Sequence, residues 1–115
     1  MEGKNNGMTE AVLIVNFSYS LTQDQLKAAA QDFAENVKPN VDGLIWKIFL
    51  NQPEKKRSGG VYLFRDAESA QNYLNSSYVE KLKQAPGLSD FSVEIFETMT
   101  EASVAAGASM SMSAA

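Results

Sequence analysis

Six segments of alternating character follow one another between residues 11 and 100, and their order restricts the possible folds of this chain more than any other feature. Four segments are short runs of apolar and β-branched residues, which are typical of strands. The other two carry apolar residues at spacings of three and four, which predicts helices with one apolar face. The predicted strands are Ala11–Phe17, Leu44–Leu50, Val61–Arg65 and Phe91–Met99.

Polar residues mark where both helices begin. Thr22 and Gln25 have the spacing of a capping box, and Asp66 can cap the second helix. Pro39 is expected to end the first helix. The apolar stripe of the first helix consists of Leu26, Ala29, Ala30, Phe33 and Val37. That of the second consists of Ala67, Ala70, Tyr73 and Leu74, and Tyr78 and Leu82 continue it after a break.

The order strand, helix, strand, strand, helix, strand predicts an α+β domain of the ferredoxin-like kind. Right-handed crossovers then give a four-stranded antiparallel sheet with both helices on one face. The second strand is apolar on both faces, with Leu44, Trp46, Ile48 and Leu50 on one and Ile45 and Phe49 on the other. Because the helices cover only one face of the sheet, we expect the other face to pack against a second copy, so that the protein is a homodimer.

Both ends of the chain differ in composition from the segment 11–100, which is the predicted domain. Residues 1–10 are polar and rich in glycine and asparagine, which predicts a flexible lead. Residues 101–115 are mainly small, and Gly107 and the serines weaken any helix there. This tail is predicted to be a loose extension that docks on the partner subunit, with plain disorder as the alternative.

The chain lacks both cysteine and histidine, and this absence excludes several kinds of chemistry. No disulfide, thiol nucleophile, histidine acid–base pair or histidine-ligated haem can form. Zinc would need carboxylate ligands alone, which is unusual. No glycine-rich loop precedes a helix, so the sequence supports no flavin or nicotinamide site. We therefore expect the protein to use neither a metal nor a cofactor.

Charge and hydropathy restrict the partners. The net charge of −4 argues against nucleic acid, because binding to phosphates needs a clustered basic surface. The one basic run, Lys55–Arg57, follows Glu54 and is more typical of a solvated turn, which is predicted at 51–60. No apolar run is long enough to span a bilayer, and no signal peptide opens the chain. These features predict a cytoplasmic protein that contacts neither nucleic acid nor membrane.

The stretch Gly43–Phe64, GLIWKIFLNQPEKKRSGGVYLF, resembles the YdhR-like family of mono-oxygenases in the dimeric α/β-barrel superfamily. The resemblance covers residues 11 to 100, and the pieces that match are Gly43–Lys47, the charged turn, Gly59–Phe64, Asp66, Ala70, Tyr73, Leu74 and Val93–Phe96. It implies a dimer whose two sheets form a barrel, with a pocket between helices and sheet in each subunit. Related members oxidise phenolic or anthrone-like compounds with dioxygen and without metal or flavin, whereas others degrade haem or act as isomerases and cyclases.

Three residues are candidates for catalysis. Asn16 is a lone amide in an apolar strand, and a buried amide needs hydrogen-bond partners. Quinone-forming relatives carry an asparagine on the first strand and use a tryptophan, so the resemblance implies that Asn16 holds a substrate oxygen or developing oxyanion and that Trp46 stacks on a flat substrate. Tyr62 could donate its hydroxyl to a substrate carbonyl. The structural alternatives are an asparagine bonded to nearby backbone, and a tryptophan and a tyrosine in the core.

Further residues are expected to support this site. Phe33, Phe64 and Tyr73 are candidates to line the pocket, although aromatic residues at such spacing usually form core. Glu94 is a possible base, but a solvated edge position explains it better. Lys47 points to the face opposite Trp46, where it could neutralise an anionic substrate or, more simply, snorkel from an edge strand and block unwanted strand pairing.

Together with these residues, the resemblance implies a cofactor-independent mono-oxygenase that oxidises a small phenolic or anthrone-like substrate with dioxygen as co-substrate. One alternative is a non-catalytic small-molecule-binding or stress-related dimer module, which needs the same pocket and no reactive group. Another is an isomerase or cyclase, which needs an acid or base in the pocket. Some relatives use a histidine as base, so here an acidic substrate, or Glu94, would have to serve.

Overall fold

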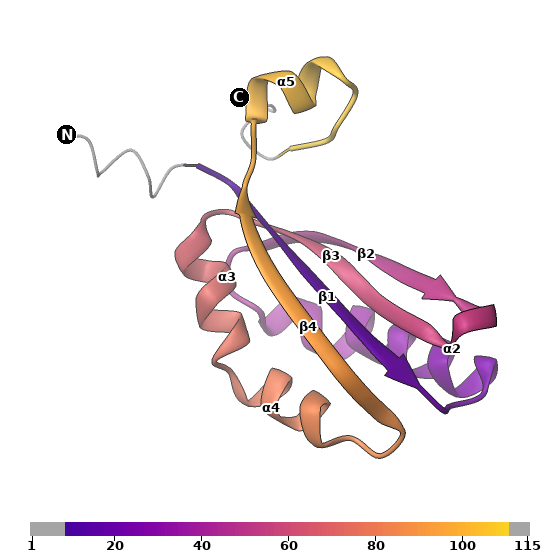
Figure 1. The fold of residues 1–115 in the computed structure, drawn as a ribbon. Coiled ribbons are helices and arrows are strands. Elements are labelled where there is room, and N and C mark those ends of the chain that lie inside the picture. Colours follow the sequence, from indigo (N-terminus) through magenta and orange to yellow (C-terminus); the bar gives the residue numbers. More distant parts are fainter. Residues whose placement is uncertain (1–8, 111–115) are drawn as a thin grey trace.

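A computed structural model of the chain describes residues 9–110, in which the strands and helices follow the predicted order up to the last strand, and a further helix, α5, comes after it (Figure 1). The elements are β1 (Ala11–Tyr19), α2 (Gln23–Asp32), β2 (Leu44–Gln52), β3 (Arg57–Phe64), α3 (Ala67–Leu74), α4 (Ser77–Gln84), β4 (Leu88–Glu97) and α5 (Thr100–Ala105). The break predicted in the second helix separates α3 from α4.

The four strands form one antiparallel sheet in the order β2-β3-β1-β4. Helices α2, α3 and α4 all lie on one side of it (Figure 1). The predicted ferredoxin-like α+β fold is therefore confirmed. Strand β1 is an inner strand, as its two-sided apolarity predicted.

Burial alternates along β1 and defines the two faces of the sheet. The odd-numbered residues from Ala11 to Tyr19 are buried under the helices, and we call this the helix face. The even-numbered residues point to the opposite side, which we call the open face. On the helix face, residues of β1 and β3 pack against α3 and α4 in a core that includes Leu13, Val15, Phe64, Ala70, Tyr73 and Val79.

The capping box predicted for the first helix is present. The Thr22 Oγ1 accepts a hydrogen bond of 3.1 Å from the Gln25 amide, and the Gln25 Oε1 accepts one of 2.9 Å from the Thr22 amide. Helix α2 then ends at Asp32, before the predicted Pro39. The chain continues as a π-helical turn (Phe33–Val37) and a 3₁₀ turn (Lys38–Asn40), in which the proline sits in the first turn, where its missing N–H is tolerated.

The turn predicted at 51–60 is much shorter in the structure. Strand β2 runs to Gln52 and β3 begins at Arg57, so only a 3₁₀ turn (Pro53–Lys55) and Lys56 connect them. Lys56 has a positive φ of 53°. The composition of this segment was misleading because Gly59 and Gly60 are strand residues: β3 is an inner strand, and its backbone approaches its neighbours closely there.

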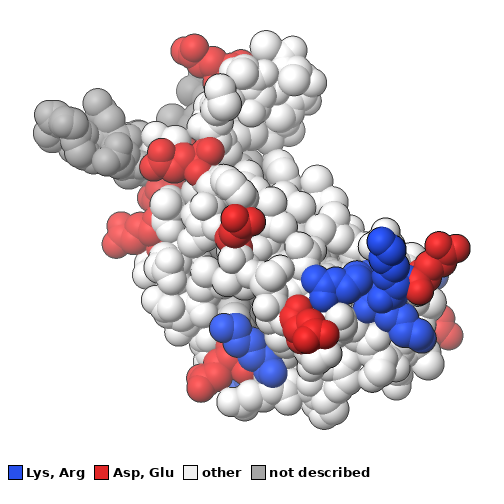
Figure 2. Space-filling view, viewed as in Figure 1, with Lys and Arg blue, Asp and Glu red and all other residues white. Residues whose placement is uncertain are grey.

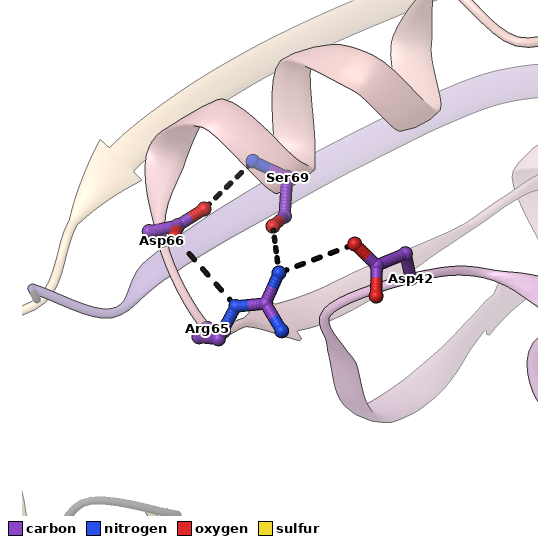
Figure 3. Close-up of polar contacts among 4 residues, drawn as sticks. All are labelled: Asp42, Arg65, Asp66 and Ser69. Atoms are coloured by element: carbon purple, nitrogen blue, oxygen red, sulfur yellow. Dashed lines mark hydrogen bonds and ion pairs between the residues drawn. The ribbon is translucent and has the colours of Figure 1, made fainter. Parts of the chain in front are cut away.

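A cluster of polar side chains fixes the start of α3 (Figure 3). Asp66 caps the helix as predicted, because its Oδ1 accepts a 2.8 Å hydrogen bond from the Ser69 amide. This bond lowers the pKa of Asp66. Arg65 lies 3.7 Å from Asp66 and 3.2 Å from Asp42, and it also donates to the Ser69 hydroxyl. The predicted Arg65–Asp66 surface pair is therefore present.

The chain ends were predicted to be loose, and their described parts are folded. Residues 1–8 and 111–115 lie outside the described residues. Glu10 is buried, and its carbonyl accepts a 2.9 Å hydrogen bond from the Thr98 amide. Helix α5 follows β4 and stands apart from the layer of α2–α4 (Figure 1). Beyond it, Met110 is buried in this subunit.

Candidate functional site

A cavity of about 460 Å³ lies on the helix face, between the sheet and helices α2 and α4. Its α2 side is formed by the whole apolar stripe predicted from the sequence, Leu26 to Val37. No residue of α2 is fully buried, whereas α3 buries Ala70 and Tyr73 against the sheet. The cavity therefore exists because α2 stands away from the sheet while α3 packs tightly on it.

Aromatic rings form the inner wall of this cavity. The Phe33 ring meets those of Phe49, Tyr62 and Tyr73 edge-on, with centroid separations of 5.9, 5.9 and 6.4 Å. These edge-to-face contacts are the favoured geometry for aromatic pairs. Phe33 also opens the π-helical turn, a feature often found at functional sites. A wall of this kind suits a flat apolar ligand.

One ammonium group lies among these rings. The Lys47 Nζ is 3.8 Å from the centroid of the Phe33 ring, 4.2 Å from that of Phe49 and 4.5 Å from that of Tyr62. A Cβ added at Gly60 would lie 2.4 Å from the Lys47 Cε, so the glycine leaves the room that this side chain occupies. Lys47 thus turns inward over the sheet and does not snorkel outward from its edge strand.

Two effects act on the charge of Lys47 in opposite directions. Burial lowers its pKa from 10.5 to about 7, because the charged form is desolvated. The faces of the surrounding rings favour the ammonium. Within residues 9–110, the ion pairs that the structure contains involve Arg65 and leave Lys47 without a carboxylate partner. Burial therefore brings the neutral amine of Lys47 within reach near neutral pH, while the rings favour its ammonium.

The two tyrosines of the wall remain neutral. Burial raises the pKa of Tyr62, and the neighbouring Tyr73 raises it further through charge repulsion and hydrogen bonding. Burial also raises the pKa of Tyr73. Both side chains can therefore act as hydrogen-bond donors across the neutral pH range.

A ring of three hydrogen bonds ties α2 to the sheet at one end of the cavity. Tyr19 donates to the Asn51 Oδ1 at 2.9 Å, Gln23 donates to the Tyr19 hydroxyl at 2.8 Å, and Asn51 donates to the Gln23 Oε1 at 2.9 Å. Asn51 also lines the cavity. These residues could not be predicted from the sequence, because they come from three segments and form no local pattern.

The structure brings together only some of the predicted site residues. Tyr62, Phe33 and Tyr73 line the cavity as predicted. Phe64 does not: it is fully buried behind the wall, with its ring stacked on Tyr62 at 6.2 Å.

Asn16 and Trp46 were candidates to face the pocket, and Glu94 was a possible base for which a solvated position was the better explanation. All three lie on the open face. Asn16 is an even-numbered residue of β1, where the buried odd-numbered residues face the helices. Glu94 is paired with Ile14 and is exposed. Trp46 is paired with Leu63, next to Tyr62, and its Nε1 donates a 2.8 Å hydrogen bond to the Ser109 carbonyl of the tail. None of them can reach a ligand bound in this cavity from its own subunit.

A bulge explains why Lys47 rather than Trp46 reaches the cavity. In the ladder between β2 and β3, Leu44 pairs with Phe64 and Trp46 with Leu63, so Ile45 is an extra residue. Simple alternation places Leu44 and Trp46 on one face. The extra residue reverses the alternation of side chains between the two faces of the sheet after Ile45. Leu44 therefore stays in the core, and Lys47 and Phe49 lie on the same face as Leu44.

Two further properties bear on function. Among residues 9–110, no three carboxylates gather into a group that could hold a metal ion. No helix in the same range has the length and apolarity needed to cross a membrane.

Solved structures similar to this chain confirm the fold. The cofactor-independent oxygenase SnoaB from Streptomyces nogalater superimposes with a TM-score of 0.62 at 11% identity, covering 78% of this chain and 93% of that one. The NE2512 protein of unknown function from Nitrosomonas europaea gives a TM-score of 0.57 at 23% identity, covering 81% and 92%. A MhuD variant with two manganese protoporphyrin IX molecules per active site gives a TM-score of 0.59 at 18% identity, covering 77% of this chain and 94% of that one.

No curated protein sequence matches this chain. The sequence profile of the family described as "Putative mono-oxygenase ydhR" matches residues 12–109, which is most of the chain and includes every strand and helix from α2 to α5. This chain therefore belongs to the ydhR mono-oxygenase family.

Proposed function

We propose that the protein is a cofactor-independent mono-oxygenase that oxidises a small, flat, electron-rich aromatic compound with dioxygen. The observation that carries this proposal is the aromatic-walled cavity of about 460 Å³ in a chain of the ydhR mono-oxygenase family. A cavity of this size and lining suits a compound of two or three fused rings. The fold likeness to SnoaB, a cofactor-independent oxygenase, agrees with the proposal.

The proposed reaction needs no external reductant. An aromatic compound with an acidic hydroxyl loses its proton, and the anion passes an electron to dioxygen. The two radicals recombine as a peroxide, which loses water and leaves a quinone carbonyl. One oxygen atom thus enters the product and the other leaves as water, with all four electrons supplied by the substrate.

The chain's own residues contribute an apolar wall and hydrogen-bond donors. The rings of Phe33 and Phe49 give the cavity an apolar wall, and a flat ligand that stacks on them would displace water from beside the reacting anion. The neutral hydroxyl of Tyr62 can donate to the oxygen on which charge develops.

Haem fits these residues poorly, although the MhuD variant of the same fold holds a manganese porphyrin. The usual histidine and cysteine ligands are absent from the chain. A tyrosine binds haem iron as the phenolate, and the raised pKa values of Tyr62 and Tyr73 oppose that form. The proposed reaction therefore includes no haem.

Oxygen uptake tests the proposed function. Phenols, naphthols and anthrones are screened in an oxygen electrode, with the quinone measured by absorbance. We expect one dioxygen consumed per quinone, at the same rate after chelation and desalting. Uptake that depends on added flavin or metal would refute cofactor independence, and binding without uptake would favour a non-catalytic binding module.

Replacing Tyr62 by Phe removes the hydroxyl and keeps the ring. We expect turnover to fall on the order of 100-fold, the usual effect of losing one donor to a developing oxyanion. Stability should change by only about 1 kcal/mol, because one hydrogen bond is lost. Asn16→Ala is the matched variant on the open face, and its kcat should stay close to that of the wild type. A much larger loss of turnover in Asn16→Ala than in Tyr62→Phe would show that Asn16, and not Tyr62, takes part in the reaction.

We further propose that two copies pack through the open face. It exposes large apolar side chains, with Ile48 53% and Phe96 48% exposed. In Figure 2, drawn in the same view as Figure 1, the largest group of Lys and Arg lies at the end of the molecule where β2 and β3 turn, and uncharged residues form most of the visible surface. An apolar sheet face of this kind is stable in water once a second copy covers it.

Light scattering at micromolar concentration checks this pairing. Val61 lies between Ile14 and Ile48 on the open face, so Val61→Lys would place a charge in the middle of the interface. We expect the wild type to be a dimer and Val61→Lys a folded monomer. Gln71→Lys adds the same charge to an exposed position of α3 and should remain dimeric. A monomeric wild type would contradict the proposal.

A further inference from the structure

We propose that Lys47 receives the proton of an acidic hydroxyl on a flat aromatic substrate and then holds the resulting anion beside its ammonium. The inference rests on the proposed function, and it names both the missing base and the class of substrate. The chain has no histidine, and the one possible base that the sequence offered, Glu94, lies exposed on the open face.

The position of Lys47 favours an aromatic ligand with one polar edge. Its Nζ lies 3.8 to 4.5 Å from the centroids of three rings that border the cavity. A flat ligand stacked among these rings would bring a ring oxygen within reach of the Nζ. Because the amine is fixed on a strand and held in place by the rings, it is preorganised for that contact.

The charges around the cavity also favour an anion. Besides Lys47, the titratable side chains that line it are Lys27 and Asp32 from α2, Tyr62 from β3, Tyr73 from α3, and Tyr78 and Lys81 from α4. Lysines therefore outnumber carboxylates by three to one in the lining. The single carboxylate, Asp32, already accepts a 2.7 Å hydrogen bond from Asn36. A bound anion would thus meet an excess of lysines, of which Lys47 is the one that lies among the rings.

The lowered pKa of Lys47 allows its amine to accept a proton from the substrate. With a pKa of about 7, the side chain is partly the neutral amine at neutral pH and can accept a proton. The hydroxyl O–H bond breaks, the proton moves to the Nζ, and a phenolate and an ammonium form side by side. Beside the apolar rings, their attraction offsets the desolvation that disfavours each ion alone.

The lowered pKa of Lys47 also favours a substrate whose acidic group is a hydroxyl rather than a carboxyl group. A carboxylic acid is already ionised at neutral pH and needs no proton acceptor. A phenol whose acidity is raised by a fused ring or a carbonyl group has a pKa closer to that of the amine, where proton transfer is most effective. The substrate class is therefore an acidic hydroxy-aromatic compound.

The test uses 4-nitrophenol, whose ionised form absorbs visible light and whose neutral form does not. A nearby cation lowers the pKa of a bound acid by about one to three pH units, and an apolar site without one raises it. On titration with wild-type protein at mildly acidic pH, we expect the phenolate band to appear. Lys47→Met should abolish the band, whereas Lys55→Met, on the exposed turn of the same hairpin, should retain it.

The outcomes separate this inference from the proposed function. A phenolate band of equal size with Lys47→Met, or no binding of 4-nitrophenol to the wild type, would overturn the role of Lys47. A band that depends on Lys47, with no oxygen uptake on any substrate, would support Lys47 as the anion site and refute the oxygenase. Oxygen uptake that is unchanged in Lys47→Met would uphold the oxygenase and overturn Lys47 as the proton acceptor.

Discussion

Lys47→Met is expected to make the protein more stable than the wild type at neutral and acidic pH, and this advantage should disappear in alkaline solution. Most substitutions in a folded protein destabilise it, so an increase would be distinctive. The reason is the cost of burying an ammonium among the rings of Phe33, Phe49 and Tyr62. Methionine has a similar length and carries no charge.

The sign of the pH dependence follows from where the proton is lost. The unfolded chain keeps the proton of Lys47 up to about pH 10.5, whereas the folded protein releases it near pH 7. Between these values the unfolded state holds more protons, so the stability of the wild type rises with pH. The advantage of Lys47→Met is therefore largest below pH 7. It falls by about 1.4 kcal/mol per pH unit above that and has gone by about pH 10.5.

Magnitudes decide which of the two effects on Lys47 prevails. Lowering its pKa from 10.5 to about 7 corresponds to a cost of roughly 5 kcal/mol for the charged form. Cation–π attraction from the rings contributes about 2 kcal/mol in the opposite direction. Burial should therefore dominate.

Urea unfolding of both proteins at several pH values measures this difference directly, because all other titrations cancel between them. Lys55→Met is the control and should differ from the wild type by the same small amount at every pH. If Lys47→Met were the less stable protein at pH 6, the rings would outweigh desolvation. Lys47 would then be a permanent cation and could not accept a proton.

Alanine at Gly59 and alanine at Gly60 are expected to have very different effects, although the two glycines are neighbours in β3. A Cβ at Gly59 would lie 1.9 Å from the carbonyl oxygen of Val15, which is backbone of the adjacent inner strand and cannot move without breaking the ladder. We expect Gly59→Ala to cost more than about 3 kcal/mol, the upper end of the usual effect of overpacking. Poor solubility of the variant would accompany this loss.

Gly60→Ala meets a flexible side chain instead. Its Cβ would lie 2.4 Å from the Lys47 Cε, where the lysine can change rotamer, and 3.2 Å from the Tyr62 Cε1, which needs to shift by only a small amount. We expect a loss of about 1 kcal/mol or less in stability, because little packing is lost. The displaced ammonium should move toward water, so the phenolate band of bound 4-nitrophenol should weaken.

Chemical unfolding and the nitrophenol titration together check this pair. Equal stability losses in the two variants would show that the close approach of β3 to β1 is not rigid. A Gly60→Ala variant with an unchanged phenolate band would show that Lys47 does not need the space above Gly60.

The fold was determined largely by local patterns in the sequence. The apolar runs, the stripe on α2, the capping box at Thr22 and the cap at Asp66 all depend on residues a few positions apart. Because helix and strand periods are local properties, these elements could be predicted from the chain alone. The uncovered sheet face followed from the same patterns, since two predicted helices cannot cover two faces.

The location of the site was decided only by the tertiary structure. Ile45 is an extra residue in the β2–β3 ladder, and this bulge turns Lys47 toward the cavity and Trp46 away from it. Alternation along one strand cannot reveal a bulge, because the bulge is defined by pairing with another strand. The same holds for Asn16, whose strand is apolar on both faces and so gives no sign of which face meets the helices.

The chemical character of Lys47 likewise depended on residues far apart in the sequence. Phe33 and Tyr62 come from α2's continuation and from β3, and together they desolvate an ammonium that sequence alone places on an edge strand. Gly60 adds the space in which that side chain lies. A pKa reflects the whole surroundings of a group, so it emerges only when distant segments pack together. The sequence thus determined which elements form, and the packing of those elements decided which side chain meets the ligand.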